Sequence, residues 1–168
     1  YAFKASGFWS EERESNLLDG AAHFYDTYEC ADKKFLAVGS IEPQFYSVLL
    51  EKLEITDPKF QDQHNKKLWP ELKVIIAEKI KKKSRDEWAN IFDGSDACVA
   101  PVLSLSEAPK HHHMKARNSF IDIDGVIQPA PAPRFSNTPA QIRHSSVKAG
   151  ENNEEICSKY DLDRSCFS

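Results

Sequence analysis

The sequence predicts an α+β fold in which β-hairpins pack with several helices. Two stretches have the pattern of paired strands joined by short turns, and three stretches have apolar residues at helical spacing. Strands and amphipathic helices without a regular alternation of the two are typical of α+β domains. With 168 residues, of which 40% are hydrophobic, the chain is long enough to bury a core.

The first hairpin is predicted near the start of the chain. Asp19-Gly20 is a turn dipeptide, and residues 24–30 then supply the aromatic and β-branched side chains that favour a strand. Residues 31–33 form the turn, and residues 35–38 form the returning strand.

A helix is predicted for residues 43–53, where apolar side chains recur at helical spacing. Pro43 suits the first helical position, because its fixed φ fits the helix and its missing N–H would have no partner there. We therefore expect Glu42 at the helix cap. Glutamate is a poorer cap than Ser, Thr, Asp or Asn, so capping alone does not account for it. A carboxylate at a helix N-terminus is stabilised in its charged form and is ready to accept a hydrogen bond.

Two further helices are predicted at residues 69–80 and 84–92. The first again has a proline in its first turn. The second begins with Ser84 followed three residues later by Glu87, which is the spacing of a capping box, and it is stopped by Gly94. We expect these two helices to pack against each other as a hairpin.

A further strand and a second hairpin are predicted beyond the helices. Residues 97–103 form an apolar run of strand length, whose proline indicates an edge position or a strand end, and a helix or turn follows. Residues 120–123 and 126–128 form the second hairpin, since Asp124-Gly125 tolerates the positive φ angles of a two-residue turn.

These elements divide the chain into three parts. Residues 1–20 lack a clear period and form an entering or linker segment; residues 21–128 form a small α+β domain. Residues 129–168 form a proline-rich linker and a C-terminal return segment, with one more short helix at residues 154–160. We expect both flanking segments to pack on another domain and, without it, to expose their aromatic side chains: Phe3, Phe8, Trp9, Phe135 and Phe167.

Composition excludes several classes of function. The net charge of −4 gives no support for binding a polyanion, so no nucleic-acid partner is expected. No apolar run reaches 18 residues and no signal peptide opens the chain, so neither membrane insertion nor secretion is indicated. The chain starts with Tyr1, and we expect it to be a fragment whose upstream half is missing. The cysteines include no C-x-x-C pair and favour a reducing compartment: Cys30, Cys98, Cys157 and Cys166.

The sequence FIDIDGV, with Asp122 and Asp124, resembles the first motif of the haloacid dehalogenase family. In that family the first Asp attacks phosphate and the second is a general acid, on a fold that needs a parallel sheet and further motifs downstream. Only about forty mostly irregular residues follow here. We therefore favour a hairpin turn.

Two other clusters have simpler interpretations as solvated segments. His111, His112 and His113, with Glu107, invite a metal-site interpretation, but consecutive residues of a helix point in different directions, whereas a chelating pair needs i, i+4 spacing. We expect no metal site there. A basic run that could contact phosphates suits the C-terminal end of a helix and is expected to be solvated: Lys79, Lys81, Lys82, Lys83 and Arg85.

A resemblance to a known family covers residues 16–156. The sequences NLLDGAAHFYDTYECADKKFLA, VGSIEPQFY and IFDGSDACVAPVLSLSEA resemble the C-terminal part of α-methylacyl-CoA racemases, in the class III CoA-transferase family. The resemblance implies a small domain whose flanking segments pack on a Rossmann-like domain that binds CoA. It also implies epimerisation of 2-methyl-branched acyl-CoA thioesters through an enolate. No cofactor is expected, since the CoA thioester is the substrate.

The resemblance also implies roles for two residues. In the family, a His in a G-H-D motif and an Asp in an A-D-F motif exchange the proton, and both lie upstream of the part that this chain resembles. The glutamate of IEPQ, here Glu42, orients the catalytic His of the partner subunit in an interlocked homodimer. The tyrosine of G-G-A-P-F-Y, here Tyr25, contacts substrate, although Ala21 and His23 stand where the family usually has Gly and Pro. This chain alone is expected to be inactive.

Two alternatives remain open at this point. A class III CoA-transferase of the formyl-CoA or carnitine type would cover an upstream Asp with a glycine-rich loop, and the six glycines here are isolated. The second alternative is a non-catalytic dimerisation or binding fragment of such an enzyme. By resemblance we expect an intracellular location in the peroxisome or mitochondrion, although Cys166-Phe167-Ser168 does not match the family's frequent peroxisomal address.

Overall fold

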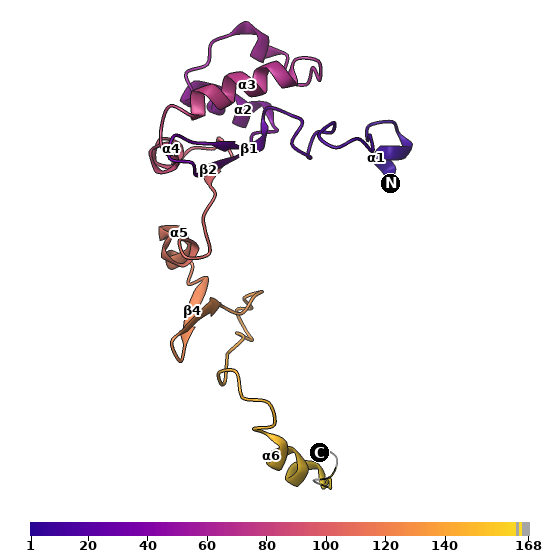
Figure 1. Ribbon diagram of the computed structural model, residues 1–168, viewed down its shortest axis with the longest axis vertical. Coiled ribbons are helices and arrows are strands. Elements are labelled where there is room, and N and C mark those ends of the chain that lie inside the picture. The colour runs from indigo at the N-terminus through magenta and orange to yellow at the C-terminus, as the bar shows by residue number, and fades with distance from the viewer. Residues whose placement is uncertain (164, 166–168) are drawn as a thin grey trace. The chain divides into compact units, whose positions relative to one another are not determined.

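The structure of the protein is a computed structural model that describes residues 1–163 and 165. Two compact units follow one another along the chain, residues 1–102 and residues 103–168 (Figure 1). The boundaries expected at residues 20 and 128 stay predictions. Within the part of the chain that the structure describes, no helix is both long enough and apolar enough to cross a membrane.

The first unit is built on a three-stranded antiparallel sheet. The strands β1 (Tyr25–Glu29), β2 (Phe35–Gly39) and β3 (Val99–Pro101) lie in the order β1-β2-β3. The register pairs Tyr25 with Gly39 and Val38 with Val99. The predicted first hairpin is confirmed, and the predicted strand at residues 97–103 is confirmed as a shorter edge strand that ends at its proline.

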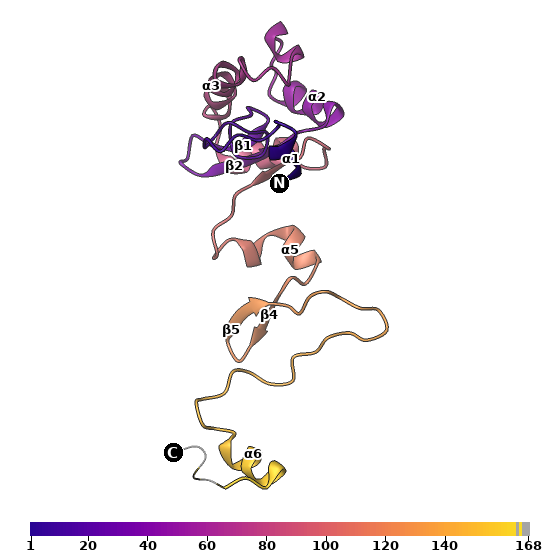
Figure 2. The same ribbon diagram turned by 90° about the vertical axis from the view of Figure 1, so that its right-hand side faces the viewer.

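One face of this sheet is buried and the other is open. Tyr28, Leu36 and Val38 are buried, whereas Thr27 and Phe35, which point to the opposite face, are exposed. The elements α2 (Pro43–Lys52) and α3 (Trp69–Ile80) lie on the same side of β1 and β2 (Figure 2). The core consists mostly of large apolar side chains from the sheet and the helices, among them Phe24, Leu49, Leu72, Ile76 and Trp88.

The last helix of this unit, α4 (Arg85–Phe92), packs differently from our expectation. α3 contacts β1, whereas α4 contacts β2 and β3, so the two helices do not pack along each other as a hairpin. They meet where the indole N–H of Trp88 donates to the Ile80 carbonyl, at 2.7 Å. In this arrangement the ring of Trp88 is buried in the core.

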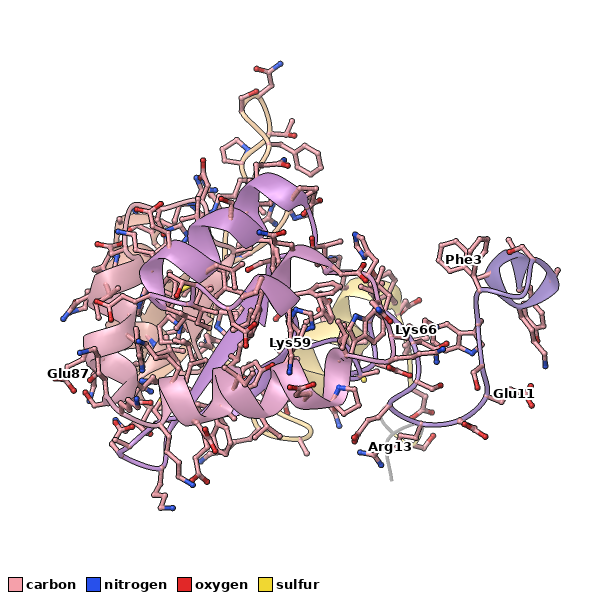
Figure 3. All side chains as sticks on the ribbon, turned by 90° about the horizontal axis from the view of Figure 1, so that it is seen from above. Phe3, Glu11, Arg13, Lys59, Lys66 and Glu87 are labelled. Carbon is pink, nitrogen blue, oxygen red and sulfur yellow. The ribbon has the colours of Figure 1, made fainter. Side chains whose placement is uncertain are left out.

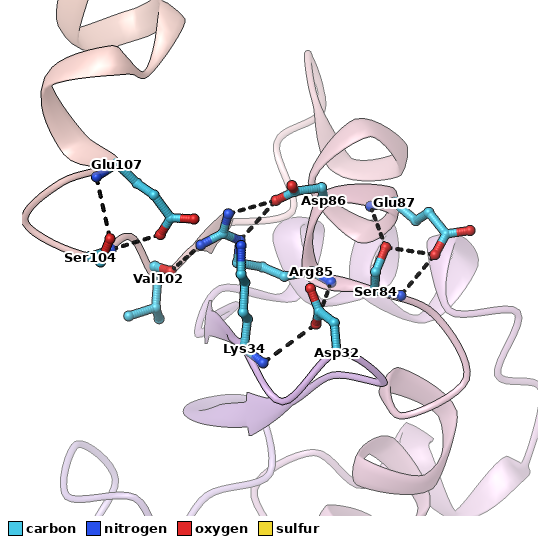
Figure 4. A network of polar contacts seen from close by, with 9 residues as sticks. All are labelled: Asp32, Lys34, Ser84, Arg85, Asp86, Glu87, Val102, Ser104 and Glu107. Atoms are coloured by element: carbon cyan, nitrogen blue, oxygen red, sulfur yellow. Dashed lines mark hydrogen bonds and ion pairs between the residues drawn. The ribbon is translucent and has the colours of Figure 1, made fainter.

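The capping box that starts α4 is confirmed. The Ser84 hydroxyl accepts a hydrogen bond from the Glu87 N–H, and the Glu87 carboxylate accepts one from the Ser84 N–H at 2.8 Å (Figure 4). These bonds satisfy two donors that the first helical turn leaves without partners. The side-chain hydroxyl and backbone N–H of Ser84 hold the pKa of the Glu87 carboxyl below its usual value.

Arg85 corrects the prediction that the basic run is solvated. Its side chain is buried, and its guanidinium donates to the Asp86 carboxylate at 2.7 Å and to the Val102 carbonyl at 2.9 Å (Figure 4). Its backbone N–H also donates to Asp32 at 3.1 Å. The prediction was wrong for this residue because its guanidinium reaches the Val102 carbonyl, 17 residues along the chain, and so fixes the end of β3 against α4. Lys81, Lys82 and Lys83 are exposed, as expected.

The N-terminal segment of the first unit holds one short helix, α1 (Ala2–Ala5), and is otherwise irregular. Figure 3 shows Phe3 away from the bulk of the side chains. The exposed fractions of Phe3, Phe8 and Trp9 are 65%, 74% and 45%. Exposure of these aromatic side chains was expected. In the second unit Phe135 is likewise exposed, and Phe167 lies outside the described residues.

The second unit contains the other predicted hairpin, β4 (Phe120–Ile123) and β5 (Val126–Pro129), which form a two-stranded antiparallel sheet. Asp124 and Gly125 have φ angles of 53° and 83°, and the Asp122 carboxylate accepts a hydrogen bond from the Gly125 N–H at 2.8 Å. The DIDG sequence therefore serves a tight turn, as favoured over a phosphatase motif. The remaining elements are η2 (Ala108–Lys110), α5 (His112–Ala116) and α6 (Asn153–Tyr160).

Candidate functional site

Glu42 lies at the N-cap of α2, as predicted, but its side chain does not cap the helix. Its backbone is extended, with φ −73° and ψ 143°, and Pro43 opens the helix. The Glu42 side chain is exposed and makes no cap hydrogen bond, and no hydrogen bond or ion pair joins it to another described residue. Because the Glu42 carboxylate has no hydrogen-bond partner among the described residues of this unit, it is available to bind a group outside the unit.

Tyr25 opens β1 on the exposed face of the sheet, directly opposite Gly39. A Cβ built on Gly39 would lie 3.8 Å from the Tyr25 ring, so the ring lies close beside the glycine backbone. Tyr25 is half-buried and packs against the core cluster. Its hydroxyl makes no hydrogen bond with any described residue, so this polar group is available at the surface.

Cys98 lies in one groove with Tyr25, and the charge of Glu42 acts on its thiol. Its carbonyl accepts a hydrogen bond from the Gly39 N–H at 2.9 Å, and its own backbone has a φ of 53°. Partial burial, followed by the negative charges of Glu42 and Asp96, raises the pKa of the Cys98 thiol. Tyr25, Gly39, Cys98 and Ala100 line one groove of about 450 Å³ on the open face of the sheet. The structure thus places Tyr25 and Cys98 in one groove, and the charge of Glu42 acts on the Cys98 thiol.

Sequence reasoning assigned no role to Cys98. Its position in the stretch IFDGSDACVAP was visible, but the resemblance carried no residue role onto it. The hydrogen bond to Gly39 spans 59 residues of sequence, and no local pattern reports such a contact.

His23 stands at the position where the family usually has Pro. It is fully buried, and its Nε2 lies 2.7 Å from the hydroxyl of Tyr46 in α2. Its ring packs edge-on against Phe24 and Phe60. Burial, and then the nearby His64, lowers the pKa of His23 to about 4, so the ring is neutral at pH 7. Here His23 acts as a core residue that ties the start of β1 to α2.

The other candidate residues lie in the second unit. His111 precedes α5 while His112 and His113 lie in its first turn, and the rings of His111 and His112 are 4.4 Å apart. Among residues 1–163 and 165, no group of three or more His, Cys, Asp or Glu side chains is arranged to hold a metal ion. Asp122 serves the hairpin turn described above.

Comparison with known proteins places the chain in a family. The family model for CoA-transferase family III matches residues 3–153. The chain belongs to CoA-transferase family III. Within this family it is 46% identical to the α-methylacyl-CoA racemase of Mus musculus and 43% identical to that of Homo sapiens. These matches cover 92% and 93% of this chain, but only 41% of either relative. The chain therefore spans less than half the length of the racemases it resembles.

Solved structures share the fold. A CAIB/BAIF family protein from Brucella suis superposes with a TM-score of 0.66 at 22% identity, over 94% of this family III chain and 42% of its own. A structure from Mycobacterium tuberculosis superposes with a TM-score of 0.63 at 14% identity, over 80% of this chain and 38% of its own. The predicted α+β class is confirmed.

Proposed function

We propose that this chain is the C-terminal part of an α-methylacyl-CoA racemase that epimerises 2-methyl-branched acyl-CoA thioesters. The observation that carries the proposal is the 43–46% identity to two racemases over nearly the whole chain. The region of similarity includes IEPQFY, whose glutamate has an uncommitted carboxylate in this structure. Relatives that are called CoA-transferases are less similar, with 36% and 26% identity.

The proposed reaction removes the proton α to the thioester carbonyl from one face and returns a proton to the other face. The intermediate enolate carries negative charge on the thioester oxygen, so the reaction needs two acid–base groups and donors for that oxygen. One carboxylate cannot serve both faces. We assign the acid–base pair to a His and an Asp of the part of the enzyme that this chain does not contain.

Glu42 is proposed to accept a hydrogen bond from the imidazole of that His in the partner subunit of a homodimer. A carboxylate bonded to one ring nitrogen fixes the tautomer, so that the other nitrogen faces the substrate. It also stabilises the imidazolium that forms when the ring takes the α-proton. Exposure of Glu42 at a helix start supports this role, because the side chain is accessible and the helix dipole favours its charged form.

Tyr25 is proposed to contact the acyl-CoA substrate through its hydroxyl. The ring is fixed by packing beside Gly39, whereas the hydroxyl has no partner among the described residues. A fixed phenol with a free hydroxyl can position a polar atom of the thioester at little entropic cost. The homodimer and the peroxisomal or mitochondrial location stay predictions.

Isotope exchange separates the proposed racemase from a CoA-transferase. The full-length enzyme that contains this chain is incubated with one epimer of a 2-methylacyl-CoA in deuterated water. We expect deuterium at the α-carbon together with formation of the other epimer. Transfer of CoA to a carboxylate acceptor without α-exchange would instead establish a CoA-transferase.

A further inference from the structure

Glu42 follows a short segment, Gly39 to Ile41, whose backbone is bonded to several parts of the first unit. The Gly39 N–H donates to the Cys98 carbonyl at 2.9 Å, and the Ser40 N–H donates to the Phe24 carbonyl at 3.0 Å. The hydroxyl of Ser40, which is fully buried, donates to the Ala97 carbonyl at 2.5 Å. These contacts hold the N-terminal part of the segment between the sheet and the strand that follows α4.

The last two carbonyls before Glu42 are bonded by one side chain, that of Gln63. Its Nε2 donates to the Ser40 carbonyl at 3.1 Å and to the Ile41 carbonyl at 2.9 Å. Gln63 is 7% exposed. A carboxamide nitrogen carries two hydrogens, so both donors of this group are used on the backbone immediately before Glu42.

These bonds fix the direction in which the Glu42 side chain leaves the backbone. The peptide before its Cα is held by the bond from Gln63 to the Ile41 carbonyl. The peptide after its Cα is held by the bond from the Tyr46 N–H to the Glu42 carbonyl, at 2.9 Å. Two peptide planes determine φ and ψ of the residue between them, and φ and ψ set the direction of its Cα–Cβ bond.

Gln63 is itself firmly held. The indole N–H of Trp69, a buried residue at the start of α3, donates to the Gln63 carbonyl at 2.8 Å. The preceding 3-10 helix η1 (Pro58–Gln61) buries Phe60 in the core, and its Lys59 forms an ion pair with Glu71 of α3 (Figure 3 labels Lys59). The amide therefore transmits the position of α3 to the start of α2.

We infer that Gln63 is a positioning residue for the proposed racemase reaction: its side-chain amide orients the backbone from which the Glu42 carboxylate reaches the catalytic His. This inference rests on the proposed function of Glu42. Without the amide, the two carbonyls need other donors, and the peptide before Glu42 rotates to find them. Misplacement of a catalytic contact by a small distance lowers the rate far more than it lowers substrate binding.

The test is a double-mutant cycle in the full-length enzyme, with kcat for α-proton exchange measured on Gln63→Met, Glu42→Gln and the double variant. Methionine keeps the length of the side chain and removes both donors. We expect Gln63→Met to lower kcat about tenfold when Glu42 is present. We expect it to lower kcat less than about twofold in the Glu42→Gln background, because residues that act through one contact are not additive.

A purely structural role predicts a different pattern. Gln63→Met would then lower the melting temperature and change kcat per folded enzyme by the same factor in both backgrounds, or not at all. Either result would overturn the inference while leaving the role of Glu42 intact. If Glu42→Gln alone keeps the full kcat, the proposed role of Glu42 fails, and the inference fails with it.

Ser40→Ala is the matched control. It removes a buried donor from the same segment but leaves both peptides flanking Glu42 bonded, so we expect lower stability and unchanged kcat. If Gln63→Met does not fold, Gln63→Asn enters the same cycle. That variant keeps the amide but is one methylene too short to reach both carbonyls, and the same pattern of non-additive kcat values is expected.

Discussion

The buried imidazole of His23 is bonded to the hydroxyl of Tyr46, with 2.7 Å between Nε2 and the phenolic oxygen. The bond joins the loop before β1 to the first turn of α2, where the Tyr46 N–H also holds the Glu42 carbonyl. His23 stands where the family usually has proline, so this chain replaces a rigid loop residue by a buried polar contact. Because burial disfavours the charged form of the His23 ring, the stability of the protein depends on pH.

Acidification should destabilise the protein through His23. Its folded-state pKa of about 4 lies below the ordinary value of 6.5, so the unfolded chain binds more protons between these values, and stability falls as pH drops through this window. From pH 7 to pH 5 we expect a loss of about 2 kcal/mol. Urea denaturation at both pH values measures it. In His23→Gln, which does not titrate, this part of the pH dependence should vanish; an unchanged dependence would assign it to other groups.

Loss of the α4 capping box should lower stability without touching the candidate site. Ser84→Ala removes the hydroxyl that accepts from the Glu87 N–H, and we expect a loss of about 1 kcal/mol. Ser84→Gly, in which water can reach the free N–H groups, should lose only a few tenths of a kcal/mol. Thermal denaturation compares the two variants. An unchanged stability of Ser84→Ala would show that the hydroxyl contributes nothing to the helix start.

The sequence predicts elements that depend on neighbours within a few residues. The Ser84–Glu87 capping box, the Asp124-Gly125 turn and the proline at the start of α2 are all local chemistry, and all three are confirmed. Burial of Arg85 and the packing of α4 were mispredicted, since both depend on partners far along the chain.

The residues of the candidate site also fall into two groups, those that a local motif predicts and those that only the structure shows. Glu42 and Tyr25 were each found through a short motif, whereas the groove that Tyr25 shares with Gly39 and Cys98 became visible only with the sheet register. Gln63 lies in a polar stretch without periodicity, and its amide reaches carbonyls 22 and 23 residues away. A side chain that bonds to backbone carries no pattern in the sequence beyond its own residue type.

Tyr25→Phe should weaken substrate use and leave the fold intact. The variant removes a hydroxyl that has no partner among the described residues and keeps the ring beside Gly39. We expect a higher KM for 2-methylacyl-CoA in the full-length enzyme, with an unchanged melting temperature. Tyr25→Ala, which also removes the packed ring, should raise KM and in addition lower the melting temperature. An unchanged KM in Tyr25→Phe would show that the Tyr25 hydroxyl does not contact substrate and that the role of Tyr25 is structural.

The central claim is that Glu42 serves the reaction and not the helix. In the full-length enzyme, Glu42→Gln keeps the size of the side chain but weakens a charge-assisted hydrogen bond worth about 1.5 to 3 kcal/mol. At about 1.4 kcal/mol per factor of ten, kcat for α-proton exchange should fall roughly ten- to hundredfold.

The deciding measurement is kcat and melting temperature on the same Glu42→Gln enzyme, with this chain alone as the inactive reference. Because the Glu42 side chain makes no cap hydrogen bond, we predict a melting temperature within experimental error of the parent enzyme and the loss of kcat given above. Full kcat with a lowered melting temperature would contradict the account and make Glu42 a helix cap.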